Sequence, residues 1–126
     1  MQGLHLTADL HACHCAPKWL TDADRLGQRC VQAVAAADLQ AVAQLFHTFP
    51  ATAQGPGGVT ATVLLAESHL CVHTWPEQRA VTLDVYVCNF GGDHAAKAHA
   101  LMATLTRLFE PGHTEQRSLQ RGQIAP

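Results

Sequence analysis

The run from 80 to 88 constrains the fold of this chain more than any other segment. Every second residue in it is apolar, from Val81 to Val87, and the residues between them are mostly polar, which is the pattern of a strand with one buried face. Alternation of this kind recurs elsewhere, so the main element is a sheet with one apolar face. We predict strands over residues 4–11, 39–49, 58–66, 69–74, 80–88 and 113–121.

Two segments with helical spacing complete the pattern. Apolar residues recur every three or four positions over 22–37 and over 94–109, with Thr21 and Asp93 as the expected N-caps. Because the helices are few and consecutive strands are expected to pair, we predict an α+β two-layer sandwich. It has a mostly antiparallel sheet with both helices on one face, in a single domain over 1–126.

The opposite face of this sheet has an unusual choice of residues. It is expected to carry His5, Asp9, Thr60, Cys71, His73, Asp84, Tyr86 and Cys88. Thiols and imidazoles are poor choices for a solvated face, where lysine and glutamate are more common. We therefore predict a functional site or an interface there.

Composition narrows the classes of function. Charged residues make up 14% of the 126 residues and the net charge is −2, without a basic block, so no nucleic-acid partner is expected. No apolar run approaches the ~18 residues that cross a bilayer, and the first residues lack the pattern of a signal peptide. An odd number of cysteines, 5, argues for free thiols in a reducing compartment. We expect a cytoplasmic protein that is not bound to a membrane.

The segment 66–77, AESHLCVHTWPE, holds the densest chemistry. It contains one of the two serines, two histidines, a thiol and two carboxylates. Ser68 is flanked by Glu67 and His69, not by the glycines of a hydrolase nucleophile elbow. The two lysines lie in no glycine-rich context, which disfavours a pyridoxal enzyme.

Two groups of histidines and cysteines have residue types that bind zinc. They are His11, Cys13, His14 and Cys15, and His69, Cys71 and His73. Structural zinc sites usually have two separated pairs of ligands, with two to four residues inside a cysteine pair. We predict no metal in the site, and keep a non-catalytic His/Cys metal-binding module with Ser68 uncut as the alternative from another class.

Several short motifs point to a single family. They are Glu67-Ser68-His69, His73-Thr74-Trp75-Pro76-Glu77, Asp84 and Cys88, with Gly3-x-His5-Leu6, Phe46-His47-x-Phe49 and Gly58-Val59-Thr60. Together they resemble the short prokaryotic S-adenosylmethionine decarboxylase proenzymes, over most of the chain.

The resemblance implies a cofactor made from the chain itself. Ser68 attacks the carbonyl of Glu67, and the chain is cut into 1–67 and 68–126 with a pyruvoyl group in place of Ser68. The ketone of that group forms a Schiff base with the substrate amine. The implied substrate is S-adenosylmethionine, whose product donates an aminopropyl group for spermidine synthesis. The implied assembly is a homodimer with its sites at the interface.

The resemblance also implies roles by position. His73 matches the base of the elimination step, and Cys88 the acid that reprotonates the α-carbon. Glu77 matches the carboxylate that binds ribose, Phe49 the ring that stacks on adenine, and Thr60 a serine that assists processing. A pyruvoyl-dependent arginine or ornithine decarboxylase remains the alternative, although Glu77 favours a ribose.

One difficulty follows from the alternation. Ser68 and His73 fall on opposite faces of one strand, whereas a base that serves Ser68 must lie on its side. We therefore predict a bend or bulge near 67–69.

Overall fold

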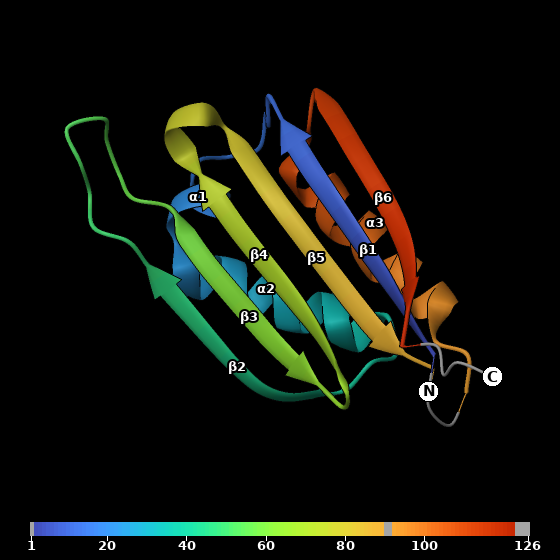
Figure 1. Ribbon diagram of the computed structural model, residues 1–126. Helices are drawn as coiled ribbons and strands as arrows, with labels where there is room; N and C mark the ends of the chain where they lie inside the picture. The colour runs from blue at the N-terminus through green and yellow to red at the C-terminus, as the bar shows by residue number, and fades with distance from the viewer. Residues whose placement is uncertain (1, 90–91, 123–126) are drawn as a thin grey trace.

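Six strands form one antiparallel sheet in the order β2-β3-β4-β5-β1-β6 (Figure 1). The computed structural model describes residues 2–89 and 92–122. The strands are β1 (Gly3–His11), β2 (Ala41–Thr48), β3 (Val59–Leu65), β4 (Ser68–Trp75), β5 (Ala80–Cys88) and β6 (His113–Arg121). All the predicted strands are confirmed, with small shifts at their ends. Strand β1 lies between β5 and β6, so the first and last strands of the chain are neighbours in the sheet.

The helices lie together on one face of this sheet (Figure 1). They are α1 (Lys18–Thr21), α2 (Ala23–Ala36) and α3 (Ala95–Phe109), and a 3-10 turn, η1 (Pro76–Gln78), joins β4 to β5. Helix α2 packs on β2 and β3, and α3 on β1 and β5. This arrangement confirms the α+β two-layer sandwich. Among the described residues, no helix has both the length and the apolar character that a membrane crossing needs.

The start of α2 differs from the prediction. Asp22, not Thr21, is the N-cap, and its side chain accepts a hydrogen bond from the backbone N–H of Arg25 at 3.1 Å. Such a cap contributes about 1 kcal/mol. Thr21 belongs to the short helix α1, where its hydroxyl donates to the carbonyl of Pro17 at 3.0 Å. The unexpected helix α1 therefore moves the boundary by one residue.

The open face of the sheet is organised in rows, because opposed residues of antiparallel strands lie on the same face. One row contains Leu64, His69, Tyr86, His5 and Leu119, and the next contains Thr62, Cys71, Asp84, Thr7 and Arg117. The polar residues predicted for this face are half-buried, except that Cys88 is only 7% exposed.

A two-residue turn, Ala66-Glu67, joins β3 to β4. Glu67 has a left-handed backbone with φ 55°, which costs a residue with a side chain about 1 kcal/mol. From Ser68 to His73 the pairing of β4 with β3 is unbroken, so the predicted bulge is wrong. The bend is confined to Glu67, and Ser68 and His73 remain on opposite faces.

Candidate active site

The predicted site residues gather in two pockets at opposite ends of β4. Glu67, Ser68 and Cys88 line one, and Phe49, Thr60, His73 and Glu77 line the other. We call them the Ser68 pocket and the His73 pocket. His73 follows Ser68 by five residues, which is about 17 Å along a strand. Within one copy of the chain, the two groups therefore do not meet.

The Ser68 pocket lies between the end of the sheet and the helices, and has a volume of about 240 Å³. The Oγ of Ser68 accepts a hydrogen bond from the backbone N–H of Cys88 at 3.0 Å. This contact holds together two predicted residues that are far apart in the sequence. Asp38, which follows α2, and Lys97, on α3, close the pocket with an ion pair of 3.4 Å.

His94, which the sequence suggested only as a structural residue, also lines the Ser68 pocket. Its Nδ1 is buried and has no hydrogen-bond partner in the described part of the chain. Such an atom is costly unless a ligand or water satisfies it. His94 and Lys97 belong to a helix remote from the motif, so no local signal in the sequence could have placed them beside Ser68.

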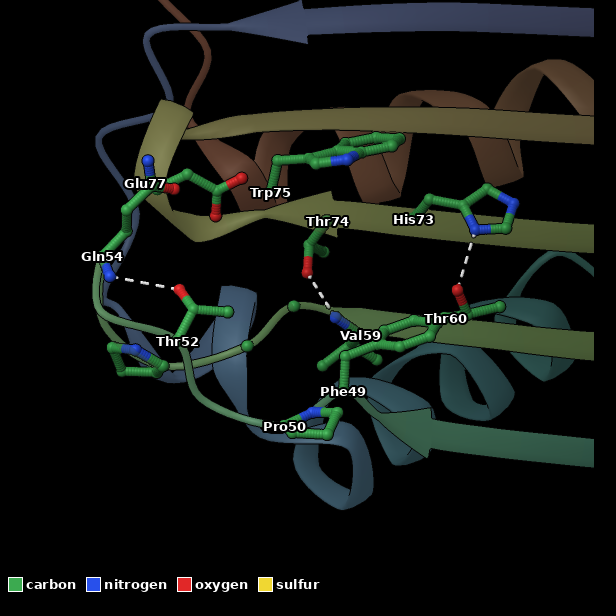
Figure 2. Close-up of a pocket in the computed structure, with 13 residues that line it drawn as sticks. Phe49, Pro50, Thr52, Gln54, Val59, Thr60, His73, Thr74, Trp75 and Glu77 are labelled. Carbon is green, nitrogen blue, oxygen red and sulfur yellow. Dashed lines mark hydrogen bonds between the residues drawn. The ribbon is translucent and has the colours of Figure 1, made fainter.

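The His73 pocket is larger, about 560 Å³, and is closed by the loop between β2 and β3 (Figure 2). The Nδ1 of His73 lies 2.9 Å from the Oγ1 of Thr60, so two residues that the resemblance selected form a hydrogen-bonded pair. Phe49 and Trp75 add aromatic surface, and Glu77 adds an exposed carboxylate. A ligand that joins an aromatic base to a sugar with free hydroxyl groups would match this combination of side chains.

Local packing positions the Thr60–His73 pair. The buried hydroxyl of Thr74 accepts from the N–H of Val59 at 2.8 Å and donates to the carbonyl of Leu20 at 2.7 Å. A Cβ at Gly58 would overlap the Thr74 carbonyl oxygen, so the chain enters β3 through a position that only glycine fits. Trp75 also lines this pocket, and its place two residues after His73 in the motif was the only signal in the sequence for it.

The residues around Cys13, which were considered as zinc ligands in the alternative reading, do not form a cluster of three or more candidate ligand atoms in the described part of the chain. Cys13 and Cys15 are buried whereas His11 and His14 are exposed. Burial raises the pKa of the Cys13 thiol to about 11, as expected of a buried structural thiol. Arg79 instead donates to the carbonyls of Cys13 and Cys15 at 2.5 and 2.6 Å. This cluster therefore has a structural role.

Comparisons with known proteins agree on one family. A sequence model of the S-adenosylmethionine decarboxylase family matches residues 4–122. S-adenosylmethionine decarboxylase proenzymes of Hydrogenobaculum sp. (strain Y04AAS1) and Acidithiobacillus ferrooxidans (strain ATCC 53993 / BNL-5-31) are 33% and 34% identical. The matches cover 97% of this chain and 83% and 84% of theirs.

A solved structure leads to the same family. The crystal structure of the adenosylmethionine decarboxylase from Aquifex aeolicus VF5 superimposes with a TM-score of 0.83 at 30% identity, over 98% of this chain and 92% of that one. The two-layer fold and the motif around Ser68 are those of a decarboxylase made as a proenzyme. The chain belongs to the S-adenosylmethionine decarboxylase family.

Proposed function

We propose that this protein cleaves itself at Glu67–Ser68 and, with the resulting pyruvoyl group, decarboxylates S-adenosylmethionine to supply spermidine synthesis. One observation carries the proposal: every residue to which the resemblance assigns a role lies in one of two pockets. Membership in the family supplies the substrate class.

The cleavage begins with the Ser68 side chain turning away from the Cys88 N–H. Its Oγ attacks the Glu67 carbonyl carbon, and the peptide nitrogen leaves, so that an ester replaces the amide. Removal of the α-proton of residue 68 then expels the Glu67 carboxylate. The dehydroalanine that remains takes up water and releases ammonia to give the pyruvoyl group. The left-handed backbone of Glu67 favours the first step, because the strain is relieved when the amide breaks.

The position of Ser68 fits a pyruvoyl group, since it is half-buried, begins a strand and has Cys88 beside it. When formed, that group supplies an electrophilic carbonyl that withdraws electrons from the substrate amine. Cys88 donates the proton that replaces the lost carboxylate. Phe49 and Trp75 bind the adenine, and Glu77 accepts hydrogen bonds from the ribose hydroxyls.

The separation of the two pockets supports a homodimer. Two copies that pack with their open faces together, around a two-fold axis across the strands, bring the His73 pocket of each copy to the Ser68 end of the other. In this assembly His73 and Thr60 of one copy act on Ser68 of the second. Processing and catalysis therefore both depend on the dimer.

Exposed apolar side chains on the open face support the same assembly. Leu45, Leu64 and Leu119 are 73%, 47% and 60% exposed, and the sheet register places all three on this face. Large apolar side chains gathered on one exposed face indicate an interaction site. We also propose a cytoplasmic location, because the five cysteines are free and a reducing compartment keeps them so.

Arginine or ornithine decarboxylation is the competing function, and one experiment decides. Intact mass under denaturing conditions should show two chains, 1–67 and 68–126, and carboxyl-labelled S-adenosylmethionine should release labelled CO₂ when labelled arginine and ornithine do not. A single 13.5 kDa species after long incubation would refute self-processing. Two chains with CO₂ from arginine or ornithine alone would refute the substrate.

A further inference from the structure

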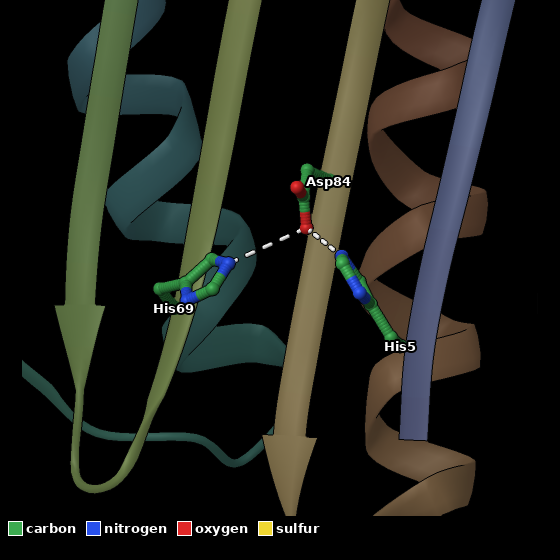
Figure 3. A group of neighbouring side chains, drawn as sticks. All are labelled: His5, His69 and Asp84. Atoms are coloured by element: carbon green, nitrogen blue, oxygen red, sulfur yellow. Dashed lines mark hydrogen bonds and ion pairs between the residues drawn. The ribbon is translucent and has the colours of Figure 1, made fainter. Parts of the chain in front are cut away.

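A second cluster of titratable residues lies at the middle of the open face, away from both pockets (Figure 3). His5 on β1, His69 on β4 and Asp84 on β5 point toward one another across adjacent strands. The Oδ1 of Asp84 lies 2.5 Å from the Nε2 of His5 and 3.4 Å from the Nε2 of His69. The side chain of His5 is 17% exposed, that of His69 33% and that of Asp84 37%.

Packing restrains the two imidazoles of this cluster. The ring of Tyr86 lies 5.8 Å from each of them, and their own centroids are 6.2 Å apart, edge to face. Tyr86 shares their row, between β4 and β1. The two rings are thus held by strands and by an aromatic neighbour, which reduces the entropy that a ligand has to overcome.

The geometry points to a metal site: we propose that His5 Nε2, His69 Nε2 and Asp84 Oδ1 bind one divalent transition-metal ion, zinc being the best match. The three atoms lie within 4.8 Å of one another, and a zinc ion with bonds near 2.0–2.2 Å needs only small side-chain movements to take them. Two imidazoles and one carboxylate suit zinc, whereas magnesium and calcium prefer oxygen ligands. Three protein ligands leave a position open for water or a further ligand.

Arg121 opposes binding in the metal-free protein. Its Nη1 lies 3.2 Å from the Nδ1 of His5, and because arginine only donates, the His5 proton is on Nε2, where it is shared with Asp84. Metal binding displaces this proton, as it does at histidine sites generally. The guanidinium also repels a dication, so Arg121 sets the affinity without being a ligand.

The site goes beyond the proposed function and is tested without measuring decarboxylation. Metal-stripped protein is titrated with ZnCl₂ by calorimetry, and bound zinc is counted by elemental analysis. We expect a tight class of about one zinc ion per chain, weakened at least tenfold in His69→Gln and in Asp84→Asn, as loss of a ligand requires.

Two further comparisons separate this site from adventitious histidine binding. His99→Gln, on the exposed side of α3, and His113→Gln, exposed on β6, should retain the tight class. Arg121→Gln should bind zinc several-fold more tightly, an effect that a merely structural role of the cluster does not produce. Circular dichroism checks that each variant folds. Equal zinc binding by the wild type and the two ligand variants, or no tight class at all, overturns the proposal.

Discussion

The Ser68 pocket and the His73 pocket lie at the two ends of one strand but differ in every other respect. The first is small, faces the helices and holds the bond proposed to be cut. The second is more than twice as large, is closed by a loop, and offers rings, a hydroxyl–imidazole pair and a carboxylate. The first holds the proposed cleavage site, and the second holds most of the surface proposed to bind the substrate.

This division matters for the proposed reaction, which needs Ser68 and His73 together. The regular pairing of β4 keeps the two side chains apart within one copy. In the proposed homodimer, the second copy supplies the residues that the first cannot bring to its own Ser68. The predictions that follow test whether the two pockets have separate tasks and whether they are completed between copies.

The largest effect is expected from removing the nucleophile. Ser68→Ala should abolish cleavage completely, because alanine has no oxygen to attack the Glu67 carbonyl, and denaturing mass spectrometry should show one intact chain. Ser118→Ala is the matched control, since Ser118 is the other serine and lies exposed on β6. It should cleave like the wild type. Cleavage of Ser68→Ala at the same bond contradicts the assignment.

Complementation between inactive variants tests the sharing of pockets. Cys88→Ala and Glu77→Gln should each process normally but lose activity, by about 10²- to 10⁴-fold for the proton donor. Expressed together, so that the two precursors can form mixed dimers before they are cut, they should recover about a quarter of wild-type activity, since half of the dimers then contain one intact site of two. The measurement is labelled CO₂ release. No recovery in a preparation shown to contain mixed dimers would place both residues in one copy's site.

A smaller effect is expected from the Thr60–His73 hydrogen bond. Thr60→Val removes the hydroxyl and should slow cleavage about tenfold, which corresponds to about 1.4 kcal/mol. Thr62→Val is matched to it, because Thr62 is on the same face of β3 and donates to the sulfur of Cys71 instead. Cleavage is followed over time by gel electrophoresis. If cleavage slows equally in both variants, the cause is a general loss of stability, and Thr60 does not position His73.

The last prediction concerns stability, not activity, and a thiol outside both pockets. Burial raises the pKa of Cys30 to about 12 from 9.0, so over this range the unfolded chain loses the proton before the folded protein does. Each pH unit should then lower the free energy of unfolding by about 1.4 kcal/mol on account of this thiol. Urea unfolding at several alkaline pH values should show a shallower fall in Cys30→Ala. Below pH about 8 the two proteins should differ by a constant amount.

The sequence predicted the fold well because its dominant signals are local. Alternation from Val81 to Val87 and the stripe of α3 are read within single elements, and the structure confirms both. The insertion of β1 between β5 and β6 depends on pairing between distant segments, which no local pattern encodes. For the same reason, the contact of Cys88 with Ser68 and the presence of His94 beside them lay beyond the sequence.

The sequence indicated residues that line the two pockets, but not how those residues are distributed between them. The roles of these residues remain predictions. The motif identified Ser68, His73 and Glu77, and periodicity correctly placed Ser68 and His73 on opposite faces. The predicted bulge was wrong, because β4 pairs regularly with β3. The proposed homodimer, with its sites at the interface, brings Ser68 and His73 together without a bulge.

The order of the strands has a consequence for the mature protein. A cut after Glu67 leaves β1, β2 and β3 on one fragment and β4, β5 and β6 on the other, and the sheet order interleaves them, with β1 clasped between β5 and β6. The fragments cannot part without breaking the pairings β3–β4, β5–β1 and β1–β6. Folding before the cut is unimolecular, whereas refolding after it needs two chains to find each other, so its yield depends on concentration. The uncut precursor can therefore refold as a single chain, whereas the cut protein cannot. Heating is expected to inactivate the cut protein irreversibly at dilutions from which the precursor recovers.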